Sequence, residues 1–241
     1  RVDAGIGRLV DHLKETGDFE NTLIMITSDN GACYEWGPHG FDGFDQRVPE
    51  RPHTSAEELA GMGGPGTWLA YGSAWAHLGN TPLAMYKHFT HEGGICTPLV
   101  VHWPRGVAGP DRWVRAPVMV QDVLPTLCEV AGATYPSQVD DHAILPPEGT
   151  SLVPLLRGGE LGERTLYFAH QGARGVRQGR WKAVWSKREP HEIAWELYDL
   201  ESDRCETRDL AAEQPERVEA LSRAWLDWAA RVKVHPFFEQ R

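Results

Sequence analysis

Apolar side chains recur every three to four positions over residues 2–15, which predicts an amphipathic helix at the start of the chain. Lys14 suits the C-terminal end of that helix, and Gly17 follows as its C-cap. Residues 23–27 are a short, β-rich apolar run, which indicates a buried strand in a parallel sheet. A helix followed by such a strand predicts an α/β fold whose ligands gather beyond the carboxyl ends of the strands.

The pattern becomes β-rich in the second half of the chain. Residues 98–104 indicate another buried strand, and a helix is expected after Pro125, ending at Gly132. From about residue 164 onward, short apolar runs alternate with Gly-containing turns, which predicts a small antiparallel sheet. Its strands and the closing amphipathic helix are expected at residues 165–169, 173–178, 180–186, 194–200 and 215–232.

Composition and charge disfavour several classes of protein. The 241 residues carry a net charge of −10 and no run rich in Lys or Arg, so nucleic acid is not an expected partner. The longest apolar stretches are too short to span a membrane. Four widely separated cysteines without a C-x-x-C pair argue against a zinc ribbon and leave disulfides open. The chain opens with Arg1 inside a predicted helix, so we expect a truncated or processed piece.

The stretch MITSDNG, residues 25–31, places Asp29 and Asn30 directly after the first predicted strand. Asn-Gly is also a strong hairpin signal, so a plain turn is the alternative interpretation. However, residues 32–75 are rich in Gly, Pro, His and aromatic side chains, and no β-rich partner segment follows at hairpin distance. Long loops in compact domains are more often functional than idle, which favours a site at Asp29 and Asn30.

A second informative stretch is KHFTHEGG, residues 87–94, which by charge pattern alone is equally typical of a solvated helix face. Its context is more specific. TSDNG at a strand end is followed by a long loop, by NTPLAMYKHFTHEGGICTPLVVHWP and finally by ELYDLESDRCETRDLA. This order closely resembles the C-terminal half of the sulfatase family, especially the arylsulfatases, and the helix–strand lead-in also looks like theirs. The resemblance covers essentially all 241 residues.

The resemblance implies an alkaline-phosphatase-like α/β fold, with a sheet flanked by helices that is only partly present here, and a small C-terminal four-stranded antiparallel sheet with a closing helix. Residues 1–160 would then be the C-terminal part of the sulfatase catalytic domain, and residues 161–241 the small subdomain. The implied reaction is hydrolysis of a small-molecule or carbohydrate sulfate ester to an alcohol and sulfate at a calcium site. Such enzymes are commonly exported, so a periplasmic or extracellular location is expected.

By motif match, Asp29 and Asn30 would be two of the Ca²⁺ ligands, with Mg²⁺ as the alternative ion. A hard cation prefers oxygen donors, which a carboxylate and an amide carbonyl supply. Lys87 matches the lysine that contacts the sulfate group, and a compact ammonium suits an anionic sulfuryl group. His77 and His91 are candidates for the substrate side, but a structural role is favoured for His88 and His91 and is equally open for His77. Three aromatic residues are candidates for a pocket wall, with core packing equally open: Tyr34, Trp36 and Trp75.

The nucleophile of the family, a formylglycine made within C/S-x-P-x-R, has no counterpart in these 241 residues. Cys96 comes nearest, in CTPLV, where Val100 stands in place of the arginine. Two oxygen side chains cannot fill the six to eight positions that calcium takes. We therefore predict weak calcium binding and no turnover by this chain alone. Its expected partner is a missing N-terminal half of the same fold, without which an apolar sheet edge stays open.

Two alternative functions stay open. A phosphodiesterase or phosphotransferase relative would place metal-binding histidines after the aspartate, as in an Asp-His motif. Asn30 occupies that position here, which favours one hard ion over a two-zinc site. A non-catalytic, sulfatase-derived binding module fits the missing nucleophile, whereas the presence of Asp29, Asn30 and Lys87 argues against it.

Overall fold

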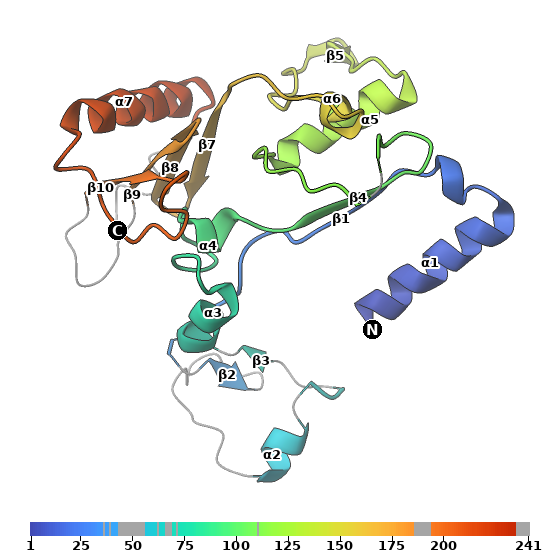
Figure 1. The fold of residues 1–241 in the computed structure, drawn as a ribbon, viewed down its shortest axis with the longest axis horizontal. Helices are drawn as coiled ribbons and strands as arrows, with labels where there is room; N and C mark the ends of the chain where they lie inside the picture. The colour runs from blue at the N-terminus through green and yellow to red at the C-terminus, as the bar shows by residue number, and fades with distance from the viewer. Residues whose placement is uncertain are drawn as a thin grey trace. The chain divides into compact units, whose positions relative to one another are not determined.

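The computed structural model describes residues 1–35, 37–38, 40–42, 56–61, 63–65, 69–70, 72–109, 111–185 and 194–234. The chain forms two compact units, one made of residues 1–27 and 99–163 and the other of residues 28–98 and 164–241 (Figure 1). The expected boundary near residue 160, between the catalytic part and the small C-terminal subdomain, stays a prediction.

The first unit is mixed α/β. Its elements are α1 (Val2–Thr16), the 3₁₀ turn η1 (Phe19–Asn21), β1 (Ile24–Thr27), β4 (Leu99–His102), the 3₁₀ turn η2 (Val120–Asp122), α5 (Val123–Ala131), β5 (Gln138–Val139), β6 (His142–Ala143) and α6 (Val153–Leu156).

Helix α1 confirms the prediction for residues 2–15. Gly17 follows it in the left-handed conformation, at φ 80°, and its N–H donates to the carbonyls of Leu13 and Lys14. This is the C-cap that the sequence predicts, because glycine adopts positive φ without steric cost. The helix buries none of its side chains within the unit, and Leu9 keeps 67% of its surface exposed. Ile6, Val10 and Leu13 are half-buried, so its apolar face is only partly covered.

The prediction for the first strand is partly wrong. Strand β1 exists, but it pairs antiparallel with β4, Ile24 opposite His102 and Thr27 opposite Leu99. The strand is also not buried, since Ile24 and Met25 are only half-buried and Ile26 is 38% exposed. The parallel, buried assignment rested on local apolarity and on the helix that precedes the strand. Neither feature fixes the direction of the partner strand, and in the part of the chain that the structure describes β1 and β4 form a ribbon of two strands.

The second unit is built on the small antiparallel sheet. Its elements are β2 (Phe41–Asp42), α2 (Ala56–Gly61), β3 (Leu69–Ala70), α3 (Gly72–Asn80), α4 (Glu92–Ile95), β7 (Thr165–His170), β8 (Ala173–Gln178), β9 (Trp181–Trp185), β10 (Trp195–Asp199) and α7 (Pro215–Arg231). The sheet order is β10-β9-β8-β7 with every pair antiparallel, so the predicted sheet and closing helix are confirmed within a residue or two at each end.

Helix α7 packs against one face of this sheet, as Figure 1 shows. Val176, Ala183 and Leu197 stand opposite one another on three neighbouring strands and are completely buried. Leu221, Trp225 and Ala229 of α7 cover them. Four residues separate each of these helix positions from the next, the spacing that places side chains on one face.

The opposite face of the sheet is mixed, with the buried Val184 and Tyr198 beside polar side chains, and it receives the segment that contains KHFTHEGG. Side chains alternate between faces along a strand, so Lys182 of β9 and Glu196 of β10 point away from α7. Glu92 and His91 bond to these two residues, and Thr90 Oγ1 donates to the carbonyl of Arg174 at 2.9 Å. The sheet thus holds the motif segment in place. No helix among the described residues has the length and apolarity to cross a membrane.

Candidate functional site

The strand end that carries Asp29 and Asn30 is fastened to the motif segment by backbone hydrogen bonds. Gly31 N donates to Gly94 O at 3.0 Å, and Lys87 N donates to Ala32 O at 3.0 Å. A Cβ on Gly31 would lie 1.7 Å from the carbonyl oxygen of Gly93. Only glycine fits at such a close approach of two backbones, which explains the glycine directly after Asn30.

Asn80, at the end of α3, bridges the same two segments with its side-chain amide. Its Oδ1 accepts from Ala32 N at 3.1 Å, and its Nδ2 donates to Gly93 O at 2.7 Å and to Met85 O at 3.0 Å. One side chain therefore satisfies backbone groups on both sides of the junction. The three segments form one hydrogen-bonded frame around Lys87.

Lys87 is in contact with a carboxylate. Its Nζ lies 3.0 Å from Glu35 Oε1, and the two side chains are 29% and 27% exposed. His88 Nε2 reaches the same oxygen at 3.1 Å, while Cys33 Sγ donates to the other carboxylate oxygen at 3.2 Å. Three donors thus converge on Glu35.

The β7–β8 turn contributes two more groups. His88 Nδ1 lies 2.6 Å from Gln171 Oε1 and 3.0 Å from His170 Nε2. The ring of Tyr34 meets the His88 ring edge-on, with centroids 5.3 Å apart. A chain of polar side chains therefore runs from Lys87 through Glu35 and His88 to an exposed turn of the C-terminal sheet.

Hydrogen bonding governs the charge of this cluster. The hydrogen bonds from Lys87, His88 and Cys33 lower the pKa of Glu35 to about 2, so it stays a carboxylate. The hydrogen bond to Glu35 raises the pKa of Lys87, and the negative charge of Asp29 adds to the rise. Burial, together with the charges of His88 and Lys87, lowers the pKa of His170, which favours its neutral form.

Asp29 is exposed and Asn30 half-buried in the turn after β1. Ser28 Oγ donates to the backbone oxygen of Asn30 at 3.1 Å. Because Asp29 acts on the pKa of Lys87, the strand end and the lysine belong to one electrostatic neighbourhood. The described residues include no group of three or more His, Cys, Asp or Glu side chains placed to hold a metal ion.

The structure places the two candidate histidines differently. His77 lies exposed on α3, away from the hydrogen bonds that join the described members of the Lys87 cluster. His91 is completely buried, and its Nε2 lies 3.1 Å from Glu196 Oε2. In this position the ring of His91 has no surface to offer a ligand.

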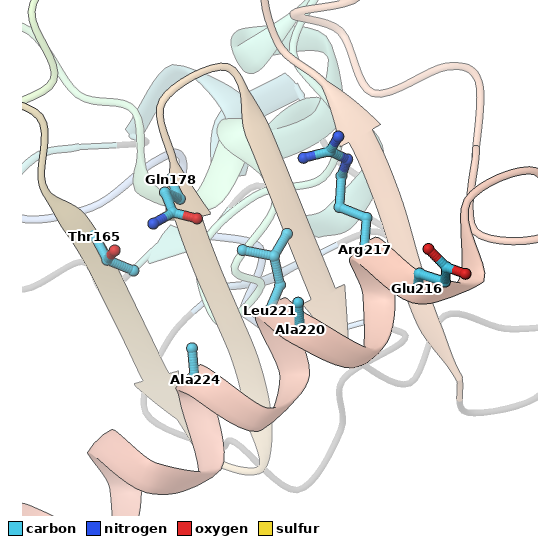
Figure 2. A pocket seen from close by; sticks show the side chains of 7 residues that line it. All are labelled: Thr165, Gln178, Glu216, Arg217, Ala220, Leu221 and Ala224. Atoms are coloured by element: carbon cyan, nitrogen blue, oxygen red, sulfur yellow. The ribbon is translucent and has the colours of Figure 1, made fainter.

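The three aromatic candidates also differ in their positions. Tyr34 packs on Tyr86, with ring centroids 4.9 Å apart, beside His88. Trp75 is 63% exposed on α3, and Trp36 lies outside the described residues. A small hollow of about 270 Å³ lies instead between α7 and strands β7 and β8, lined by Thr165, Gln178, Glu216, Arg217, Ala220, Leu221 and Ala224 (Figure 2). It shares no residue with the Lys87 cluster.

A second ionic cluster includes Glu92, which follows Lys87 closely in the sequence, and this cluster is buried. Lys182 Nζ is 2.8 Å from Glu92 Oε1 and 2.8 Å from Glu206 Oε1, the latter contact lacking hydrogen-bond geometry. Glu206 Oε2 accepts from Glu92 N at 2.7 Å. Burial acts to raise the pKa of Glu92, but the charge and hydrogen bond of Lys182, with the charges of Arg177 and Arg204, hold it below its ordinary value. This cluster ties α4 to the sheet.

Sequence reasoning missed Glu35, His170 and Gln171. Glu35 lies within the long loop, five residues after Asn30, and a loop carries no periodicity from which its partner could be inferred. The turn that carries His170 and Gln171 is evident in the sequence, but its proximity to Lys87 is not. The predicted structural role of His88 does not indicate its contact with Glu35.

Comparisons with known proteins identify the family of the chain. The family model described as Sulfatase matches residues 1–133, and the model described as N-sulphoglucosamine sulphohydrolase, C-terminal, matches residues 84–225. An uncharacterized sulfatase of Schizosaccharomyces pombe, PB10D8.02c, is 30% identical over 97% of this chain and 42% of its own length. An arylsulfatase of Klebsiella aerogenes is 33% identical over 63% of the chain and 32% of its own.

Solved structures show the same fold. Ps i-CgsB, known alone and in complex with k-i-k-neocarrahexaose, superposes with a TM-score of 0.62 and 24% identity over 94% of this chain and 40% of its own. The chain thus spans less than half the length of these relatives. The alkaline-phosphatase-like α/β fold is confirmed, and the chain belongs to the sulfatase family.

Proposed function

We propose that this chain supplies part of the metal and sulfate site of an arylsulfatase-like sulfuric ester hydrolase. The observation that carries the proposal is the frame around Lys87, in which hydrogen bonds fasten the strand end of Asp29 and Asn30 to the motif segment. A sulfate ester of a small molecule or a carbohydrate is the proposed substrate. Ps i-CgsB, by its description, binds a carbohydrate, which supports the second class.

Asp29 and Asn30 are the proposed ligands to Ca²⁺, with Mg²⁺ as the alternative. The donor chemistry fits a hard cation, since one carboxylate and one amide oxygen stand side by side at a strand end. The remaining oxygen ligands would come from residues other than these two, because calcium takes six to eight. When bound, such an ion neutralises negative charge on the sulfuryl oxygens.

Lys87 is the proposed contact to the sulfuryl group. Its ammonium is part-exposed and fixed at its backbone by the bond to Ala32, so it can turn from Glu35 towards an anion without moving the main chain. A positive charge at this place stabilises the charge that spreads over the sulfuryl oxygens and the leaving oxygen as the S–O bond breaks. The 241 residues contain no C/S-x-P-x-R segment, so we propose that the nucleophile is supplied by a further segment of the same fold.

The test uses the whole reading frame that encodes these residues, matured with formylglycine, and the 241-residue chain in parallel. We expect calcium-dependent turnover of 4-nitrophenyl sulfate by the whole protein and none by the chain alone. Lys87→Ala in the whole protein should lower kcat/KM by about 10²- to 10³-fold. The exposed Lys14, changed to Ala, serves as the control and should leave turnover intact.

Other outcomes would assign another function. Faster turnover of 4-nitrophenyl phosphate than of the sulfate ester would favour the phosphotransferase relatives. Sulfate binding without turnover, in a reading frame that lacks C/S-x-P-x-R, would favour a non-catalytic binding module. Export to the periplasm or the extracellular space is also proposed, and fractionation of the producing cell tests it.

A further inference from the structure

In the structure Lys87 is paired with the Glu35 carboxylate, which would hinder its contact with a sulfate group. Glu35 Oε1 lies 3.0 Å from Nζ, and the hydrogen bonds that it accepts keep the pKa of Glu35 near 2, so it is ionised at any ordinary pH. A sulfate group that approaches Lys87 meets this negative charge at close range. If Lys87 alone balances Glu35, the pair is neutral and offers an anion little attraction.

His88 is placed to change that balance. Its Nε2 faces the Glu35 carboxylate at 3.1 Å, and its Nδ1 faces Gln171 Oε1 at 2.6 Å and His170 Nε2 at 3.0 Å. Carboxylate and amide oxygens accept hydrogen bonds, whereas Nε2 of a neutral His170 donates or accepts according to its tautomer. Both nitrogens of His88 therefore face acceptors, and only the imidazolium form, which carries two N–H donors, satisfies both sides.

The surroundings of His88 support this reading. The pKa of His170 is lowered by burial and by the charges of His88 and Lys87, which favours the neutral form of His170. The groups that face His88 are the Glu35 carboxylate, the Gln171 amide, the His170 imidazole and the Tyr34 ring, with the Lys87 ammonium on the far side of Glu35. None of the direct partners brings a competing positive charge while His170 is neutral.

The backbone shows that this arrangement is held against a local cost. His88 has φ 80° and Gln171 φ 45°, both in the left-handed region that residues with a side chain seldom adopt. Such residues persist where the surrounding structure determines them, and they gather at functional sites. Here two of them, 83 positions apart in the sequence, meet through their side chains.

We propose that His88, as an imidazolium, is the positioning residue that takes over the Glu35 carboxylate and so leaves the Lys87 ammonium available to the sulfate group. The inference rests on the proposed role of Lys87 as the sulfate contact. Lys87 and His88 share one carboxylate oxygen, Glu35 Oε1. When an anion draws Lys87 away, Glu35 keeps its bond to His88, and the site retains one cation for the carboxylate and one for the anion. With a neutral His88, the carboxylate keeps Lys87 and repels the anion.

The test measures the affinity of the 241-residue chain for inorganic sulfate, followed by the NMR signal of the Lys87 side chain, which the Lys87→Ala variant identifies. Sulfate keeps the same charge over the range used, so a change in affinity reports on the protein. We expect binding about five- to tenfold weaker at about pH 8 than at about pH 5.5, because the proposal makes the affinity depend on a proton held between Glu35 and Gln171, and protons are scarcer at the higher pH. The exposed His142, changed to Gln, is the matched control and should keep this dependence.

Three variants make the test decisive. His88→Gln and His88→Gly should both bind weakly at both pH values, and the glycine variant suits the left-handed backbone, so misfolding does not explain its loss. Glu35→Gln should bind tightly at both, since no carboxylate competes for Lys87. Equal affinity at the two pH values in the wild type, or a dependence that survives in both His88 variants, would overturn the inference. A Lys87 signal that does not respond to sulfate at either pH would instead contradict the proposed role of Lys87.

Discussion

Two lysine–carboxylate clusters hold the same short segment, and they differ in what surrounds them. Lys182, with Glu92 and Glu206, has side chains that are 0–4% exposed, whereas Lys87 and Glu35 are 29% and 27% exposed. Glu92 and Lys87 are five residues apart. One end of the segment is thus sealed against the sheet, and the other is open to solvent.

This difference in exposure gives the two clusters different roles. In the buried cluster the ion pairs and the hydrogen bond to Glu92 N leave no room for a ligand, so its charges can only hold the segment. In the open cluster the lysine has one carboxylate partner, which it shares with His88, and a part-exposed ammonium that another anion can reach. The same chemistry therefore anchors at one place and binds at the other, and accessibility decides which.

Lys182→Met should give the largest loss of stability, because it leaves Glu92 and Glu206 buried without their cation. Breaking a buried ion pair from one side costs about 3–5 kcal/mol of the free energy of unfolding. Urea unfolding of the chain at neutral pH measures it. Adding Glu92→Gln and Glu206→Gln to the same variant removes both stranded charges and should recover most of the loss. A cost no larger than that of Lys87→Met would show that burial does not distinguish the clusters.

Gly93→Ala tests the junction between the two clusters. A Cβ there would lie 2.2 Å from Met85 O and 2.4 Å from Ala84 O, so backbone has to shift. We expect a loss of about 1–3 kcal/mol in the free energy of unfolding and, because Asn80 bonds to Gly93 O, weaker sulfate binding at Lys87. Gly7→Ala in α1 meets nothing within 4 Å and should stabilise by up to about 1 kcal/mol. An unchanged stability in Gly93→Ala would contradict the close packing of this junction.

Local pattern was enough to predict the sheet of the second unit. Strands β7–β10 carry alternating faces and are bounded by turns, and α7 has its apolar side chains three to four residues apart, so each element can be identified from its own residues. The direction of β1 could not be predicted in this way. It depends on its pairing with β4, which lies more than seventy residues further on.

The candidate site shows the same limit more sharply. Asp29, Asn30 and Lys87 were found through a family resemblance carried by contiguous motifs. The partners of Lys87 and His88 lie 52 and 83 positions away, at Glu35 and Gln171, and such contacts leave no periodic trace in a sequence. The alternation of faces in β9 does place Lys182 on the other face of the sheet from Ala183. Only the structure shows that Glu92 covers Lys182.

Glu35→Gln should have the smallest effect on stability, and its pH dependence sharpens the comparison. The pKa of Glu35 in the folded chain is about 2 against an ordinary value of 4.5, so its carboxylate stabilises the fold above pH 4.5 and this contribution disappears as the pH falls from 4.5 towards 2. Because the cluster is part-exposed and screened by solvent, we expect less than about 1 kcal/mol at neutral pH.

Urea unfolding of the wild type and the Glu35→Gln variant at a series of pH values measures this contribution. The difference between them should be present at pH 7 and shrink below pH 4.5, whereas the exposed Glu15, changed to Gln, should give no difference at either pH. A loss as large as that of Lys182→Met would mean that Glu35 is a structural anchor. The Lys87–Glu35 cluster would then stabilise the fold as the Lys182 cluster does. Its greater exposure would no longer argue for a sulfate site.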